Sequence, residues 1–137
     1  MTAFFIPMIP PTKTYQQHKI RVVNNKPVIY EPAELKAVRM KLEASLSKYA
    51  PREPETAGIR LITKWLYPTT PKHFNGEYRL SRPDTDNLQK MLKDVMTKLG
   101  FWIDDSLVAS EIIEKFWADT PGIFIQIEVL EEKSNGT

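Results

Sequence analysis

Aspartates and a lysine with a regular spacing are the residues of this chain that could do chemistry. Asp84 and Asp86 lie two residues apart, Lys90 follows Asp86 by four residues, and Asp104 and Asp105 come further along. Converging carboxylates repel one another unless a cation neutralises them, and carboxylate oxygens are ligands that Mg²⁺ and Mn²⁺ prefer. Such a metal activates water and stabilises charge on phosphate oxygens, where Lys90 would add a second cation. The spacing therefore indicates a candidate site for phosphodiester hydrolysis.

The same residues have a structural interpretation. An Asp-x-Asp-Asn sequence before a helix is suited to capping its first turn, and Asp104-Asp105-Ser106 is suited to a tight turn. Lys90 could be a solvated residue that pairs with Asp86 or with Asp94, four residues away on either side. Residue types and spacing alone leave both interpretations open.

A helix must position these groups. Apolar residues recur with a period of 3.6 over Leu88, Met91, Leu92, Val95, Met96 and Leu99. Pro83 favours a helix start after that residue, and Gly100 suits the left-handed position past its end. Asp84 and Asp86 converge only where the chain is still extended as it enters the helix. Asp104 and Asp105 meet them only if the chain folds back along the helix, as a strand from about Leu107.

The remaining elements follow from apolar patterns and turn residues. We expect a strand at 2–9, at a sheet edge or with a bulge because of Pro7, and a hairpin at 19–30 that turns at Asn24-Asn25. A helix should begin at Glu31-Pro32 and run to about Tyr49. Further expected segments are a linker at 50–57, a central strand at 59–67, a long loop at 68–83, and strands at 107–117 and 123–130.

These elements predict an α+β fold. We expect a single two-layer domain over residues 1–130, in which two helices cover one face of a mixed β-sheet. The last two strands, joined by a turn at 120–122, should pair antiparallel. Residues 131–137 are interpreted as a polar C-terminal tail.

Composition excludes several classes of protein. The 137 residues include no cysteine and only two histidines, so a thiolate or histidine-based zinc site is not expected. No apolar run is long enough to span a membrane and no signal peptide is evident, which favours a cytoplasmic protein with no membrane partner. The net charge is only +2, but residues 1–30 contain basic residues and no acidic ones. This asymmetry is typical of a surface with one nucleic-acid face, although a chance gradient would look the same.

The long loop at 68–83 combines basic and aromatic residues and leads into the aspartates. That combination suits a phosphate backbone and a distorted base, whereas the alternative is an ordinary surface loop. The candidate DNA contacts in the loop and in the basic N-terminal part are Arg82, Arg79, Lys72, Lys13, Lys19 and Arg21.

A family resemblance favours the catalytic interpretation. The sequence Asp84-x-Asp86-Asn87-Leu88-Gln89-Lys90, followed by Gly100-Phe101-Trp102-x-Asp104-Asp105, resembles the signature of the RusA family of Holliday-junction resolvases. The resemblance implies a Mg²⁺-dependent endodeoxyribonuclease that cuts four-way DNA junctions as a homodimer. Substitution of Mn²⁺ for Mg²⁺ is expected, and no small-molecule cofactor is expected.

The resemblance also implies residue roles. Asp84, Asp86 and Asp105 correspond to the essential acids that bind metal, and Lys90 corresponds to the essential lysine. Asp104 matches the neighbouring acid. Three alternatives stay open: a nuclease selective for other branched DNA, a non-catalytic DNA-binding module, and a hydrolase of small phosphorylated substrates. The last would need a closed pocket rather than a basic face.

Overall fold

The computed structural model describes residues 1–14, 19–30 and 33–131. Its strands and helices, in chain order, are β1 (Thr2–Pro7), β2 (Lys19–Val23), β3 (Lys26–Tyr30), α1 (Ala33–Leu46), β4 (Ile59–Pro68), α2 (Thr85–Lys98), β5 (Val108–Ala118) and β6 (Gly122–Val129). Two short 3₁₀ turns, η2 (Ser47–Tyr49) and η3 (Asp105–Leu107), complete the list.

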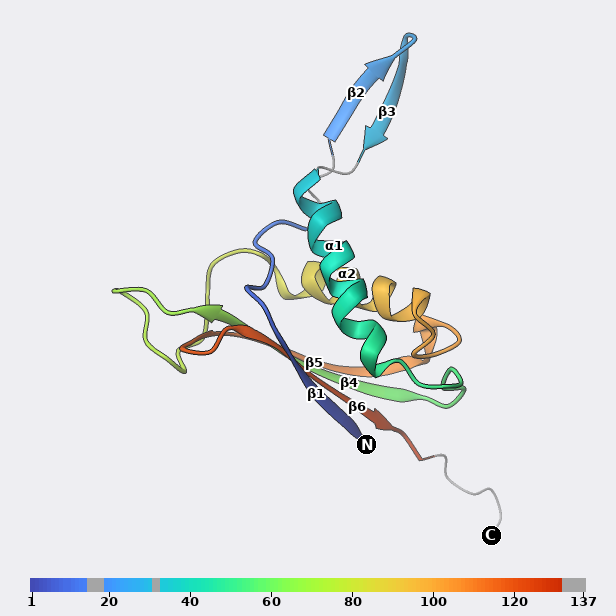
Figure 1. Ribbon diagram of the computed structural model, residues 1–137, viewed down its shortest axis with the longest axis vertical. Coiled ribbons are helices and arrows are strands. Elements are labelled where there is room, and N and C mark those ends of the chain that lie inside the picture. Colours follow the sequence, from blue (N-terminus) through green and yellow to red (C-terminus); the bar gives the residue numbers. More distant parts are fainter. Residues whose placement is uncertain (15–18, 31–32, 132–137) are drawn as a thin grey trace.

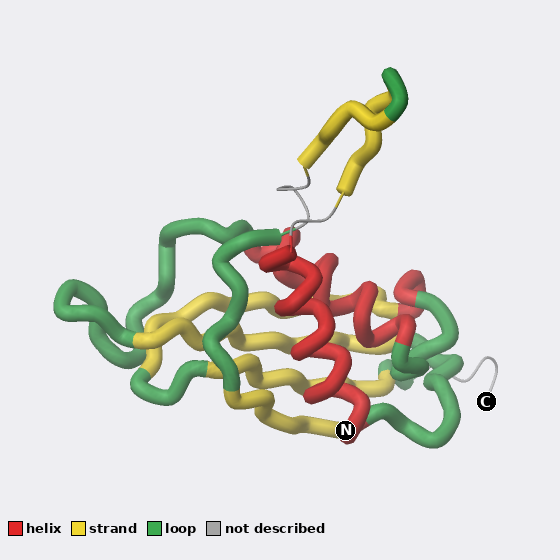
Figure 2. Tube along the Cα trace, turned by 45° about the horizontal axis from the view of Figure 1, so that its top comes forward, coloured by secondary structure: helices red, strands yellow, loops and turns green. Residues whose placement is uncertain are grey.

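The main sheet is mixed and has four strands in the order β1-β6-β4-β5. β4 and β5 run parallel, whereas β6 is antiparallel to both of its neighbours. The helix α2 makes the crossover between the parallel strands, as parallel pairing requires. Both helices lie on the same side of the sheet (Figures 1 and 2). The predicted α+β class, with two helices on one face of a mixed sheet, is confirmed.

One predicted pairing is wrong: β5 and β6 are not neighbours. Instead β6 lies between β1 and β4, and the chain between β5 and β6 passes the end of β4. The apolar residues of β6 explain its interior place, because Ile123 and Ile125 are fully buried. Gly122 allows β6 to lie against β1, since a Cβ there would lie 2.2 Å from the Phe5 ring.

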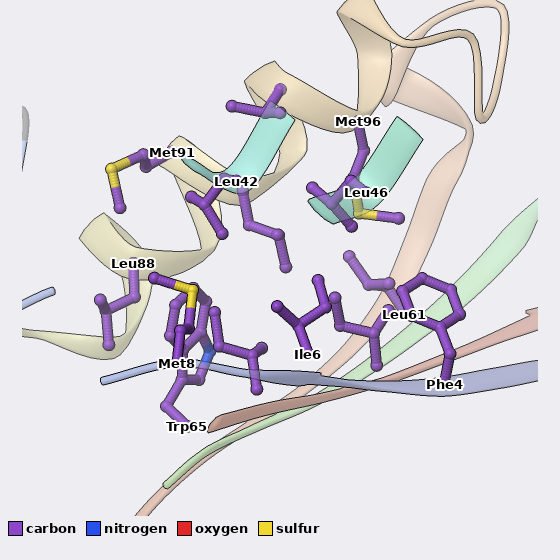
Figure 3. Packing of buried hydrophobic residues seen from close by; sticks show 14 of the residues in the cluster. Phe4, Ile6, Met8, Leu42, Leu46, Leu61, Trp65, Leu88, Met91 and Met96 are labelled. Atoms are coloured by element: carbon purple, nitrogen blue, oxygen red, sulfur yellow. The ribbon is translucent and has the colours of Figure 1, made fainter. Parts of the chain in front are cut away.

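The core fills the layer between the sheet and the two helices. Alternate residues of β4 point into it, including Leu61 and Trp65, and the predicted stripe of α2 faces them. Figure 3 shows residues of β1, α1, β4 and α2 meeting there. Phe101 and Trp102, two aromatic residues of the resemblance signature, are also buried in this core. Burial of this apolar surface fixes α2 against the sheet.

The remaining predicted elements are largely confirmed. β1 is an edge strand, and β4 has a neighbour on each side. The hairpin β2–β3 turns at Asn24 and Asn25, both with positive φ, and projects from the body near the start of α1 (Figure 1). The predicted start of α1 at residues 31–32 and the tail beyond residue 131 lie outside the described residues. In the described part of the chain, no helix is long and apolar enough to cross a membrane.

Candidate active site

The first part of the site is the N-terminal end of α2. Asp84 is the N-cap residue and keeps an extended backbone, with φ −72° and ψ 146°, but its side chain makes no capping hydrogen bond. Asp86 lies in the first helical turn and Lys90 one turn later. All three side chains are exposed. The structure thus places Asp84, Asp86 and Lys90 together at one end of one helix.

These three groups take no part in the structural bonds that the alternative interpretation required. Among the residues that the structure describes, neither Lys90 nor Asp86 forms an ion pair, and Asp94 forms none either. The cap position is occupied by Asp84, but its carboxylate does not bond the helix N–H groups. Charged side chains that form no capping bond and no ion pair are available for an external partner.

The second pair of aspartates lies beyond the other end of α2. Asp104 caps the 3₁₀ turn η3, and its Oδ1 accepts a 3.0 Å hydrogen bond from the Ser106 N–H. This bond lowers the pKa of the Asp104 carboxyl below its usual value. Asp105 is the first residue of η3 and is exposed. The turn interpretation therefore fits Asp104, whereas Asp105 does not cap the turn.

The two aspartate pairs lie about one helix length apart, as the lengths of α2 and of β5 both indicate. α2 has 14 residues, which at 1.5 Å per residue is about 21 Å. The chain does fold back along α2 as β5, but Asp105 lies before the start of that strand. It is Lys115, seven residues into β5 and about 23 Å along it, that reaches the N-terminal end of α2 through hydrogen bonds to Ser81 and Pro83.

Folding back therefore does not unite the predicted ligands within one chain. Across the described ranges 1–14, 19–30 and 33–131, no three acidic or histidine side chains gather closely enough to hold a metal ion. Asp84 and Asp86 lie at one end of α2 and Asp105 at the other.

The segment that leads into Asp84 is held by two basic side chains, which the sequence analysis did not identify as a unit. Lys115 Nζ donates to the carbonyl oxygens of Ser81 (2.7 Å) and Pro83 (2.6 Å). Arg79 donates to the carbonyl between them, that of Arg82, from Nε (3.2 Å) and Nη2 (2.6 Å). The Arg82–Pro83 peptide bond is cis. No local sequence pattern indicates these contacts, since Lys115 lies more than 30 residues further along the chain.

The loop at 68–83 is pinned to the edge of the sheet rather than free. The backbone N–H of Arg79 donates to Lys115, and that of Trp117 donates to Glu77. The Arg79 guanidinium lies over the rings of Tyr67 (4.1 Å) and Trp117 (4.6 Å), and His73 stacks on Trp117. The predicted loop at 68–83 is confirmed, and backbone hydrogen bonds and ring contacts hold it against β4 and β5.

The predicted DNA contacts have different surroundings. Arg82 and Lys72 are exposed, whereas Arg79 is half-buried and engaged as described. Lys13 is exposed and forms a 2.6 Å ion pair with Glu34 at the start of α1. Lys19 and Arg21 belong to β2, and their side chains lie outside the described part. Arg82, two residues before Asp84 in the sequence, is thus the exposed candidate nearest the carboxylates along the chain.

A buried polar chain fastens the N-terminal half of α2 to β4, and sequence reasoning missed it. Thr63 Oγ1 donates to Gln89 Oε1 (2.7 Å) and accepts from Trp65 Nε1 (3.1 Å). Gln89 is only 1% exposed, and its Nε2 lacks a partner among the described residues. A glutamine next to the apolar stripe was the available signal. These hydrogen bonds hold α2 against β4 at Gln89, the residue before Lys90.

These features define a class before any comparison is made. An α+β domain with exposed, unpaired carboxylates and a lysine at a helix start, next to basic and aromatic residues, has the parts of a nuclease acting on a phosphate backbone. Comparison with known proteins is consistent with that class. The family described as endodeoxyribonuclease RusA matches residues 9–128.

Two relatives give the same answer. The crossover junction endodeoxyribonuclease rusA of Lactococcus phage r1t is 34% identical over 97 residues, which cover 69% of this chain and 72% of the relative. The protein of the same name from Escherichia coli O139:H28 (strain E24377A / ETEC) is 53% identical over 34 residues, which cover 25% of this chain and 28% of that relative. The chain belongs to the RusA family of Holliday-junction resolvases, endodeoxyribonucleases that act on four-way junctions.

Proposed function

We propose that this protein resolves four-way DNA junctions by Mg²⁺-dependent hydrolysis of phosphodiester bonds, with Asp84, Asp86, Lys90 and Asp105 as its catalytic residues. The observation that supports this most directly is the state of Asp84 and Asp86. Both carboxylates are exposed at the start of α2, and neither is used for capping or for an ion pair among the described residues. Function, rather than local stability, explains their presence.

The donor set fits a hard divalent cation. Asp84, Asp86 and Asp105 offer only carboxylate oxygens, which suit Mg²⁺ and Mn²⁺. The bound ion would supply Lewis-acid stabilisation of the phosphate and a more acidic water. Asp104 fits less well as a ligand because one of its oxygens already accepts the Ser106 N–H.

The chain's own cations complete the reaction site. Lys90 extends from α2 one turn beyond Asp86 and has no acidic partner in the described part of the chain. It would stabilise the negative charge that grows on the phosphate as the bond to the leaving oxygen lengthens. Arg82, exposed beside Asp84, would hold a neighbouring phosphate and set the position of the strand to be cut.

The protein is proposed to act as a homodimer in which each site combines residues of both protomers. Asp105 lies a helix length away from Asp84 and Asp86 in its own chain, about 21 Å. A two-fold axis that brings the C-terminal end of one α2 near the N-terminal end of the other would unite the three acids twice. Two such sites also match a four-way junction, which needs one cut in each of two strands.

The basic and aromatic loop would contact the junction next to the cut. Exposed Phe74, Tyr78 and Leu80 lie in the same loop as Lys72. Aromatic faces can stack on bases that are unpaired at a branch point, and lysine can contact the backbone. The projecting hairpin with Lys19 and Arg21 would add contacts along one arm.

A cleavage assay tests the proposal. A synthetic four-way junction, a flap and a linear duplex would each be incubated with the protein in Mg²⁺ and in chelator. We expect paired, symmetric nicks in the junction only when Mg²⁺ is present. Cutting of the flap at the same rate would instead identify a nuclease for branched DNA in general, and tight junction binding without cleavage in Mg²⁺ or Mn²⁺ would identify a binding module.

A further inference from the structure

Three consecutive backbone carbonyls, those of residues 81–83, are held by side chains rather than by secondary structure. Lys115 Nζ donates hydrogen bonds to the carbonyl oxygens of Ser81 (2.7 Å) and Pro83 (2.6 Å). Arg79 donates two to the carbonyl oxygen of Arg82. Pro83 has no N–H to donate. Within the described part of the chain, no backbone N–H bonds any of these three oxygens. The path of the chain into Asp84 therefore depends on two cations.

The two cations are themselves fixed by the sheet. Lys115 is half-buried on β5, where its backbone oxygen also accepts the Arg79 N–H at 2.9 Å. The Arg79 guanidinium lies over Tyr67 and Trp117, whose rings belong to β4 and β5. Lys115 and Arg79 thus tie residues 81–83, which belong to no helix or strand, to the strands β4 and β5.

Lys115 also lies within electrostatic reach of a proposed ligand. Burial lowers its pKa below the usual value, the charge of Arg79 lowers it further, and the charge of Asp84 opposes both effects. The Asp84 backbone follows directly from the Pro83 carbonyl that Lys115 holds. A shift of that carbonyl would move the Asp84 carboxylate with it.

We propose that Lys115 is a positioning residue of the nuclease site, which, together with Arg79, grips residues 81–83 so that Asp84 presents its carboxylate to the metal. This inference rests on the proposed function. It assigns to Lys115 no contact with DNA and no part in the chemical step. Groups that orient metal ligands in this way commonly change metal affinity by about tenfold to a hundredfold when they are removed.

The test compares Lys115→Met with Lys93→Met. Methionine keeps the apolar stem of lysine and removes its three donors. Lys93 is the matched control, because it too joins α2 and β5, through a 2.8 Å ion pair with Glu111, but makes none of the hydrogen bonds to residues 81–83. Mn²⁺ binding would be measured by titration calorimetry on the purified protein, and junction binding in chelator by gel shift.

We expect Lys115→Met to lower Mn²⁺ affinity by about tenfold to a hundredfold, while junction binding in chelator stays equal to that of Lys93→Met. Lys115→Arg, which keeps the charge and several donors, should recover most of the affinity. If Lys115→Met does not fold, the same comparison is made with Lys115→Arg and Lys115→Gln, and the proposal requires the arginine to bind Mn²⁺ more tightly.

Mn²⁺ affinity equal to that of Lys93→Met would overturn the proposal, as would a loss of junction binding with Mn²⁺ affinity unchanged. Asp86→Asn separates this from failure of the proposed function. If wild type binds Mn²⁺ and Asp86→Asn does not, the proposed metal site is supported. The Lys115 variants then test only the positioning role of Lys115. If Asp86→Asn binds Mn²⁺ like wild type, the proposed metal site itself is wrong.

Discussion

The two ends of α2 carry similar residues but use them differently. Each end has two closely spaced aspartates and a nearby lysine: Asp84, Asp86 and Lys90 at the start, and Lys98 followed by Asp104 and Asp105 at the end. At the end of the helix, Lys98 forms a 2.9 Å ion pair with Glu43, and Asp104 accepts the Ser106 N–H. At the start, the charged side chains form no such bonds among the described residues.

We interpret this difference as one between charges that stabilise the fold and charges that serve the proposed function. A capped or paired carboxylate contributes to stability and is partly neutralised, whereas an unpaired one in a group of like charges has a local cost. The unpaired carboxylates at the start of α2 carry that cost. The backbone around them is held in place by Lys115, Arg79 and the Thr63–Gln89 hydrogen bond. By the same criterion we propose a functional rather than a structural role for Asp105, which is exposed and not used as a cap.

The largest effect should follow from Asp86→Asn. Losing a metal ligand should lower the cleavage rate by about a thousandfold or more, which equals roughly 4 kcal/mol of activation free energy. Because Asp86 is exposed, the Tm and junction binding in chelator should stay near wild type. The measurements are single-turnover junction cleavage and thermal unfolding. A fall in Tm alongside the lost activity would mean that Asp86 is structural after all, and the two ends of α2 would no longer differ.

Lys90→Gln should give the next largest effect. Removing a cation that acts on the developing phosphate charge typically lowers the rate about a hundredfold, without changing the Mg²⁺ concentration needed for half-maximal rate. Lys98→Gln is the matched control at the other end of α2, where it removes the ion pair between exposed Lys98 and half-buried Glu43. Equal rates for the two variants would contradict a special role for Lys90.

Thr63→Val tests the support beneath the start of α2. The change leaves the Trp65 Nε1 donor and the Gln89 carbonyl buried without a partner, which should lower the free energy of unfolding by about 2 to 4 kcal/mol. Thr97→Val removes the corresponding bond to Trp102 Nε1 near the end of the helix and should cost only about 1 kcal/mol. Urea denaturation measures both, and a larger loss for Thr97→Val would reverse the comparison.

The smallest effect should come from Asp104→Ala. This variant loses the acceptor for the Ser106 N–H at an exposed turn, so a slight fall in Tm is expected with cleavage close to wild type. Asp105→Asn in the same turn should instead lose cleavage while keeping the Tm. If Asp104→Ala were as inactive as Asp105→Asn, the assignment of one turn residue to structure and the other to function would fail.

Much of the fold could be predicted because its signals are local. The stripe from Leu88 to Leu99, the proline before α2 and Gly100 after it gave the helix and its bounds within a residue or two. The position of β6 could not be predicted in this way. A short connection can close a hairpin or pass the end of another strand, and only the packing of Ile123, Ile125 and Gly122 against distant residues decides between them.

The site, like the fold, could be predicted where its signals are local and could not be predicted where they depend on distant contacts. Spacing in the sequence indicated which acids and which lysine could act, and the structure places Asp84, Asp86 and Lys90 at one helix end. The sequence could not indicate that Asp105 lies a helix length away from Asp84 and Asp86. A strand that returns along α2 can bring any of its residues next to the start of the helix, and the pattern alone does not say which. The role of Lys115 has no local signal in the sequence, since its contacts with Ser81 and Pro83 join segments more than 30 residues apart.

The central claim is that the start of α2 from one protomer and Asp105 from its partner form one nuclease site. Mixed dimers of Asp86→Asn and Asp105→Asn, co-expressed with different tags and purified through both, test it directly. One of the two sites in such a dimer would keep all of its acids, so Mg²⁺-dependent nicking of one strand should return, although each homodimer is inactive. Mixed dimers as inactive as both homodimers, beside an active wild type, would contradict the claim.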